Sequence, residues 1–400
     1  MVEEITLINL PAPFLEDQMS IYPLGLLNVA THMKVHGHTV RILDCAALPA
    51  NNGHSLTYRL MKLFGDIESP TIGVSATTPQ ARFLPLLPMA KKRTAWAAAG
   101  GPHATMVSDE VLAMGYDTVV VGEAEGQTNW VAQGIFKLDP IEDLDALSFP
   151  DRTMVKNYHG SVPVMASRGC AWNCSFCSKP EIFKYRIHSP EYVIEELKTI
   201  KEEHIIFYDD TFTMDYTWVT RFCELIIKNG IRKSFRCSTR ADRISPEIAR
   251  LLKRVGFEEV CVGVESGSQE ILDILKKRTT PGVNAGARRI CAEAGLRFKA
   301  YIMVGSPGES FGTIQQTDNW LNENRPDSIG VYLFHPLPGS DIWKRRCNYD
   351  IAFDSSDFDF THYGGKREEM ISSVSTSALS KRDLTLAYWK LLEKWGQPQC

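Results

Sequence analysis

Short apolar runs alternate with amphipathic segments along the first 135 residues of the chain. The apolar runs are nearly continuous, which is typical of strands in a parallel sheet that helices cover on both faces. Small residues follow several of these runs, at the strand ends where open α/β sheets bind their ligands. We therefore expect a doubly wound, Rossmann-like α/β domain over residues 1–135. Its predicted strands are 5–10, 38–44, 71–76, 95–100 and 117–123, with a helix at 24–37.

Residues 136–160 interrupt this alternation, because they are acidic, punctuated by proline and weakly periodic, as a linker would be. A second alternation of strand-like and helix-like segments follows it. Six such units predict a (β/α)6 partial barrel over residues 161–345, with its chemistry at the carboxyl ends of the strands. A helical C-terminal extension is expected over residues 346–400. The predicted barrel strands are 162–168, 204–210, 234–240, 259–266, 298–305 and 327–336.

The composition excludes several classes of protein. Hydrophobic residues make up 44% of the chain and charged residues 23%, which is typical of soluble globular proteins. A net charge of −4 argues against nucleic-acid binding. No apolar stretch approaches the roughly 18 residues of a membrane span, and the acidic start does not resemble a signal peptide. Seven of the ten cysteines are scattered, as reduced buried thiols are, so we expect a cytoplasmic protein.

The other three cysteines lie close together in the segment SRGCAWNCSFCSKP. Cys170, Cys174 and Cys177 have the spacing C-x3-C-x2-C and follow the first predicted barrel strand. A structural zinc ion normally takes four protein ligands in two pairs, and the next histidine is His188. Three thiolates can instead hold a [4Fe–4S] cluster and leave one iron with an open coordination position. The spacing therefore favours a cluster over a zinc ion.

With Phe176 as the aromatic residue, the motif C-x3-C-x-Φ-C resembles that of the radical S-adenosylmethionine (SAM) superfamily. The resemblance implies that the open iron binds SAM and that an injected electron cleaves SAM to a 5′-deoxyadenosyl radical. The cofactor then carries the difficult chemistry, and the protein orients it. The resemblance also implies an electron donor such as flavodoxin or ferredoxin, and a small-molecule substrate.

Polar residues at the later strand ends strengthen the resemblance. By similarity to family motifs, Asp209 or Asp210 would meet the SAM amine, and Glu265 would hold the ribose hydroxyls. Ser238 and Arg240 would face other polar atoms of SAM. Each residue also has a structural interpretation, such as a helix cap for the aspartates or a Glu265–Arg240 ion pair. Their joint placement after the cysteine triple favours the functional one.

The first 135 residues resemble the cobalamin-binding module that precedes many radical SAM barrels, in the segments 22–30, 40–44, 73–78, 99–105 and 119–126. The segment 142–151 resembles the connector between the two modules. Glycines at the strand ends would let the backbone approach a bulky ring closely. The residues that the resemblance implies as cobalamin contacts are Ser75, Thr77, Gly100, Gly101, His103, Gly122 and Glu123.

One position departs from the pattern of many cobalamin proteins. Their motif D-x-H-x-x-G supplies a histidine to cobalt, whereas Ala46 stands at the matching position after Asp44. Either the domain binds cobalamin without a protein ligand, as many radical SAM members of this group do, or it keeps the fold and has lost the cofactor.

The resemblance implies a cobalamin-dependent methyltransferase acting on an unactivated carbon of a small molecule. The alternative is radical chemistry without methyl transfer, such as epimerisation, dehydration, cyclisation or rearrangement, with a cobalamin-free first domain. An iron or redox sensor would not need the acidic residues at the strand ends. A tRNA methylthiotransferase would need a second cysteine triple and usually a basic appendage. Aromatic and histidine candidates for substrate contact remain unassigned, because such stripes are more often core: Tyr185, His188, Tyr332, His335, Tyr388 and Trp389.

Overall fold

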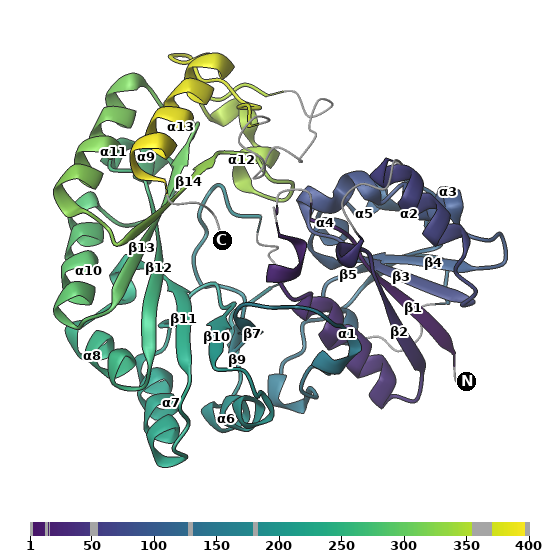
Figure 1. Cartoon of the computed structure of the whole chain (residues 1–400). Coiled ribbons are helices and arrows are strands. Elements are labelled where there is room, and N and C mark those ends of the chain that lie inside the picture. Colours follow the sequence, from purple (N-terminus) through teal and green to yellow (C-terminus); the bar gives the residue numbers. More distant parts are fainter. Residues whose placement is uncertain are drawn as a thin grey trace. The chain divides into compact units, whose positions relative to one another are not determined.

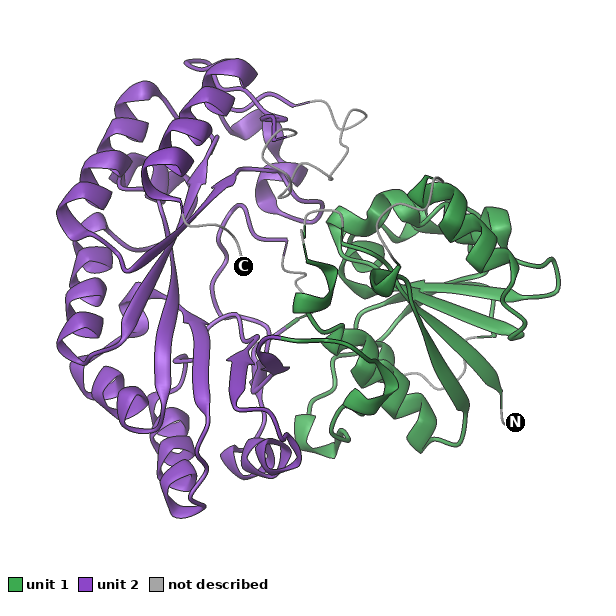
Figure 2. Cartoon of the chain, viewed as in Figure 1, with its two compact units in different colours: residues 1–159, 180–183, 359–361 green, residues 160–179, 184–358, 362–400 purple. Residues whose placement is uncertain are grey.

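The computed structural model describes residues 3–12, 15, 17–48, 55–126, 131–178, 183–353 and 370–396 (Figure 1). They form two compact units, which Figure 2 colours green and purple. The first unit contains the described residues up to His159, together with Phe183. The second contains the remaining described residues. No helix in the described ranges has the length and apolar character needed to cross a bilayer.

The first unit is built on a sheet of six parallel strands in the order β2-β1-β3-β4-β5-β6. The strand β1 lies between β2 and β3, so the order of the strands reverses direction at β1. Such sheets bind ligands at this reversal, at the carboxyl ends of β1 and β3. The strands are β1 (Glu4–Asn9), β2 (Thr39–Asp44), β3 (Thr71–Ser75), β4 (Trp96–Gly100), β5 (Thr118–Val121) and β6 (Gly134–Lys137).

Helices cover both faces of this sheet. Ala30 and Met33 of α1 pack with Ile5 on one face. Phe64 of α2 and Ile72 belong to the core on the other face. This arrangement confirms the doubly wound fold, although α2 was not anticipated from the sequence. The helices are α1 (Leu24–Val35), α2 (Leu56–Gly65), α3 (Leu86–Ala90), α4 (Gly101–Met106) and α5 (Ser108–Ala113).

The segment predicted as a linker, 136–160, lies mostly in the first unit. Its start belongs to β6, the edge strand. The Asp151 backbone N–H donates to Thr31 Oγ1 at 2.7 Å, and the Asp151 carboxylate lies 2.9 Å from Lys34 Nζ. The Tyr158 hydroxyl accepts from Asn9 Nδ2 at 2.9 Å. Specific contacts therefore tie this segment to the first sheet.

The second unit contains six parallel strands that neighbour one another in chain order, β7-β10-β11-β12-β13-β14. Consecutive order with intervening helices is the topology of a partial barrel, which confirms the (β/α)6 prediction. A short antiparallel pair, β8 and β9, stands apart from this sheet. The strands are β7 (Val162–Val164), β8 (Ser167–Arg168), β9 (Arg186–Ile187), β10 (His204–Phe207), β11 (Ser234–Thr239), β12 (Phe257–Glu265), β13 (Arg297–Val304) and β14 (Ser328–Leu333).

Several barrel helices begin at residues whose side chains accept a backbone N–H of the first turn, as N-caps do. Ser189 and Ser245 are such caps, and each is followed by a proline at the first helical position. Phe235 of the sheet packs edge-on against Phe222 of α7, and its ring lies 5.1 Å from that of Phe257 on the neighbouring strand. The helices are α6 (Pro190–Thr199), α7 (Tyr216–Lys228), α8 (Pro246–Arg254), α9 (Gln269–Ile274), α10 (Pro281–Glu293), α11 (Phe311–Asn324), α12 (Asp341–Lys344) and α13 (Lys381–Trp395).

The helix of the predicted C-terminal extension, α13, packs on the last barrel strand, β14. Lys394 and Trp395 bind Asp318 of α11 at 2.8 and 2.7 Å. The helix that covers β14 thus lies beside α11, where the sixth helix of the barrel belongs. The C-terminal extension therefore completes the sixth β/α unit.

Replacing Leu384 with alanine should destabilise the second unit by about 2–5 kcal/mol, because Leu384 lies on the buried face of α13 and is fully buried. Leu386 on the same helix is 57% exposed, and Leu386→Ala should change the free energy of unfolding by less than about 0.5 kcal/mol. Urea unfolding of both variants measures the difference. Equal effects would show that α13 is not part of this core.

Candidate functional site

The three cysteines lie on the loop between β8 and β9, beyond the carboxyl end of β7. None of the three cysteines is in a disulfide; Cys177 is exposed, and the other two are half-buried. Ser175, between them, is fully buried. Its backbone N–H donates to the Leu275 carbonyl at 3.0 Å, and its hydroxyl donates to the Ile274 carbonyl at 2.9 Å. Its own carbonyl accepts from the N–H of Ile342 at 3.0 Å, so the loop is anchored to both α9 and α12.

Asp209, just after β10, holds the start of this loop. Its side chain is 3% exposed and accepts from the Ala166 N–H at 3.1 Å and the Ser167 hydroxyl at 2.5 Å. Burial raises the pKa of Asp209 to about 7, although these hydrogen bonds lower it. The Asp210 side chain is exposed. Asp209, one of the two aspartates predicted to meet the SAM amine, is therefore already hydrogen-bonded to Ala166 and Ser167.

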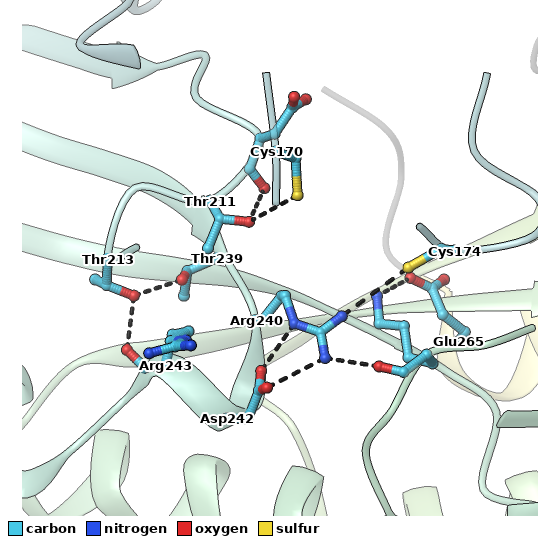
Figure 3. A network of polar contacts seen from close by, with 11 residues as sticks. Cys170, Cys174, Thr211, Thr213, Thr239, Arg240, Asp242, Arg243 and Glu265 are labelled. Atoms are coloured by element: carbon cyan, nitrogen blue, oxygen red, sulfur yellow. Dashed lines mark hydrogen bonds and ion pairs between the residues drawn. The ribbon is translucent and has the colours of Figure 1, made fainter. Parts of the chain in front are cut away.

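Arg240 connects several parts of the site (Figure 3). Its guanidinium donates to the Asp242 carboxylate at 2.9 and 3.2 Å and to the Lys277 carbonyl at 2.6 Å. Its Nη1 lies 4.0 Å from Cys174 Sγ, and its Cζ lies 4.4 Å from the Trp172 ring centroid. Two residues of the cysteine loop therefore contact one immobilised cation. Ser238 is half-buried and lies near the end of β11, two residues before Arg240.

Glu265 ends β12 with a left-handed backbone, φ 62°. Its Oε1 accepts from Lys277 Nζ at 2.8 Å, and both side chains are about nine-tenths buried. The Lys277 ammonium also lies 5.8 Å from the Phe176 ring centroid. A Cβ at Gly263 would overlap the Glu265 carboxylate, so glycine makes room for this ion pair. The Glu265–Arg240 pairing considered from the sequence does not form, because Arg240 pairs with Asp242.

The donor set suits an iron–sulfur cluster better than a zinc ion. Three thiolates can hold such a cluster and leave one iron open, whereas a structural zinc ion takes four protein ligands. Burial raises the pKa of the Cys174 thiol, while the charges of Lys277 and Arg240 lower it. Burial is the larger effect, so the pKa of Cys174 is raised, and the two cations offset only part of the cost of forming the thiolate that binds iron. The Tyr185 hydroxyl is also buried without a hydrogen-bond partner among the described residues, which leaves a donor near Cys170.

The residues expected to contact cobalamin follow strands at the carboxyl edge of the first sheet. Gly101 has φ 87°, and a Cβ there would lie 2.5 Å from Ser75 Oγ. His103 is buried, with its Nδ1 3.3 Å from Thr78 Oγ1. Burial lowers the pKa of His103 to about 4, so its imidazole is neutral near pH 7. The edge therefore combines one position that requires glycine, Gly101, with a neutral imidazole.

Other residues of this edge are hydrogen-bonded to neighbouring residues of the same unit. Thr77 caps the 3-10 helix Thr78–Phe83 together with Gln80. The Gly122 N–H donates to Thr105 Oγ1 at 3.1 Å. Glu123 is buried and accepts from the Ile141 N–H at 2.9 Å. We regard these residues as shaping the edge.

Position 46 supplies no imidazole. The Ala46 N–H donates to Asp44 Oδ1 at 3.2 Å, Asn9 Nδ2 donates to the same oxygen at 2.8 Å, and the Tyr158 hydroxyl also hydrogen-bonds to this carboxylate. The Asp44 side chain is thus held by groups of the protein, and Ala46 offers no cobalt ligand.

Asp209→Asn should flatten the pH dependence of stability. Since the folded-state pKa of about 7 exceeds the ordinary value of 3.8, the folded protein binds the extra proton between these values. The free energy of unfolding should therefore fall as pH rises from about 4 to 7 in the wild type, and less so in the variant. Ser167→Ala removes a donor that lowers the pKa of Asp209, so it should extend the fall to higher pH. Urea titrations over this range measure both effects, and an unchanged slope in Asp209→Asn would contradict the assignment.

Two family models match this chain in its two units. The B12 binding domain matches residues 15–129, and the Radical SAM superfamily matches residues 164–321.

Similar proteins share this organisation over most of their length. An uncharacterized methyltransferase of Pyrococcus horikoshii is 26% identical over 80% of this chain and 78% of its own. The hopanoid C-3 methylase of Methylococcus capsulatus is 25% identical over 88% and 74%. The structure of the radical SAM methyltransferase TsrM from Kitasatospora setae, with cobalamin and a [4Fe–4S] cluster bound, covers 93% of this chain and 84% of its own at 15% identity and a TM-score of 0.67, which shows the same fold. The chain belongs to the radical SAM enzymes that carry a B12-binding domain.

Proposed function

We propose that the protein is a cobalamin-dependent radical SAM methyltransferase that acts on an unactivated carbon of a small molecule. The observation that carries this proposal is the joint presence of an anchored three-thiol loop and a B12-binding unit with a glycine-lined edge. The alignment with the hopanoid C-3 methylase and the uncharacterized methyltransferase supports methyl transfer as the reaction.

In this proposal Cys170, Cys174 and Cys177 hold the [4Fe–4S] cluster, and the first unit holds cobalamin. When bound, the cluster supplies the electron that cleaves SAM, and cobalamin supplies the carrier of the methyl group. Ser175 and Asp209 keep the cysteine loop in one conformation, so that the thiols do not need to be ordered when the cluster is inserted.

The SAM contacts follow from the acceptor capacity of the site. Two carboxylate oxygens offer about four acceptor positions, so Lys277 leaves Glu265 able to accept from the ribose hydroxyls of SAM. Asp210, the exposed aspartate, would take the SAM ammonium. Phe176 and Ser238 would complete the contacts to the nucleoside, and Arg240 would act beside Cys174.

A second candidate function follows from Ala46, which cannot ligate cobalt. The first unit would then be a cobalamin-free scaffold, and the SAM-derived radical would drive epimerisation, dehydration, cyclisation or rearrangement. Cobalt content separates this candidate from methyl transfer.

We also infer a cytoplasmic location and an external electron donor. The nine cysteines among the described residues are free, as in a reducing compartment. Reductive cleavage of SAM needs one electron from outside the chain, which a small flavin or iron–sulfur protein such as flavodoxin or ferredoxin would supply.

Cys174→Ala should abolish both cluster binding and 5′-deoxyadenosine formation, because two thiolates cannot replace the three-point attachment. Iron analysis after anaerobic reconstitution should give about four irons per chain in the wild type and far fewer in the variant. Cys347→Ala, at an exposed thiol far along the chain, is the matched control and should retain the wild-type iron content. Full iron content and SAM cleavage in Cys174→Ala would refute the assignment.

Purification with hydroxocobalamin should give about one cobalt per chain. The visible spectrum should be that of cobalamin without a histidine ligand to cobalt, because position 46 is an alanine. Cys174→Ala should keep its cobalt, because the corrin contacts belong to the first unit. Four irons with no cobalt would leave radical chemistry without methyl transfer as the function.

A further inference from the structure

The two faces of the half-barrel sheet differ in exposure. On β13, Phe298, Ala300 and Ile302 are fully buried on the side that the helices cover. Lys299 and Tyr301, which alternate with them, are only half-buried. The interior of a closed barrel is filled by layers of side chains, so a half-exposed inner face leaves room for a ligand.

The inner face belongs to the curved sheet of the partial barrel (Figure 1), and one hydrogen bond crosses it. Ser328 on β14 donates to Glu259 Oε2 on β12 at 3.2 Å, although β13 lies between these strands. Two strands so placed are about 9.6 Å apart, twice the usual spacing. The long Glu259 side chain bridges this separation on the inner face. Lys299, Tyr301 and Glu259 therefore project from a face where groups on separate strands converge.

Positive charge exceeds negative charge on this face. Arg236 and Arg297 lie 3.7 and 3.5 Å from the Glu259 carboxylate, which can neutralise only one of them. Lys299 has no ion-pair partner among the described residues, and its ammonium lies 5.6 Å from the Tyr301 ring centroid. The Arg236 Nε is buried, again without a hydrogen-bond partner in the described ranges. The Arg236 and Arg297 side chains are 42% and 62% exposed, so these cations are within reach of an anionic ligand.

An aromatic corner adjoins these cations. The rings of Tyr301 and Tyr332 lie 5.7 Å apart at 65° to each other. Tyr301 is in register with Gly263 on one side and Gly330 on the other. A Cβ at Gly330 would lie 2.9 Å from the Tyr332 ring and 3.0 Å from the Tyr301 ring. The glycine thus makes space for two rings that can pack against a flat apolar group.

We propose that this concave face binds the methyl-accepting substrate. The substrate carries a carboxylate, which Lys299 and Arg236 hold. Next to the carboxylate it has a flat apolar portion, which packs on Tyr301 and Tyr332. The inference rests on the proposed function for the identity of the ligand as substrate.

The test uses the full-length protein and two fluorescent probes, 1-pyrenebutyrate and its neutral analogue 1-pyrenebutanol. Fluorescence anisotropy should show the carboxylate binding about 10-fold more tightly than the alcohol in the wild type. Lys299→Met should reduce this preference to less than about 2-fold. Lys228→Met, at an exposed lysine of α7, is the matched control and should retain it. Tyr332→Leu should weaken both probes and leave their ratio unchanged.

Equal affinities for the two probes in the wild type, or an unchanged preference in Lys299→Met, would overturn the proposal. Circular dichroism of each variant separates lost binding from lost folding. Iron, cobalt and 5′-deoxyadenosine are measured on the wild-type preparation alone. Failure there would reject the proposed function and leave the anion preference standing, whereas lost preference with intact SAM cleavage would reject only the substrate assignment.

Discussion

The anchoring of the cysteine loop through Ser175 is the constraint on which the cofactor site depends. A loop with three thiols has no reason of its own to hold one conformation, because fixing each residue costs about 1–2 kcal/mol of backbone entropy. Three hydrogen bonds from one buried residue attach it to the end of α9 and the start of α12. Asp209 fixes the start of the loop from β10. The thiols are therefore positioned by parts of the chain distant in sequence.

The same segment after α9 that receives Ser175 also carries the electrostatics of the site. Lys277 gives its carbonyl to Arg240 and its ammonium to Glu265. Each cation near Cys174 is consequently balanced by a carboxylate, Asp242 for Arg240 and Glu265 for Lys277. Charges this deeply buried are tolerated only when they are paired and hydrogen-bonded. The site can thus accept an anionic cluster without leaving isolated charges when the cluster is absent.

The sequence was informative where function depends on local pattern. Apolar periodicity predicted both sheets, and cysteine spacing predicted the cluster loop. Lys277 was missed because its importance comes from the turn after α9, which brings it beside Glu265 and Phe176. The alternation of apolar and polar residues along β13 was visible in the sequence. The hydrogen bond between Glu259 on β12 and Ser328 on β14 was not, because it joins two strands on either side of β13. The strand β6 was missed because a short edge strand lacks the continuous apolar run of a central one.

The position of α13 has a consequence for the order in which the molecule can be assembled. The first unit has its sheet and its contacts from Asp151 and Tyr158 once about 160 residues have left the ribosome. The barrel cannot cover β14 until residues 381–395 are made, since that surface is buried by the sixth helix. During synthesis the cysteine loop therefore emerges long before the barrel around it is closed. Cluster insertion into a finished site must wait for the last helix, while the corrin-binding edge can be ready much earlier.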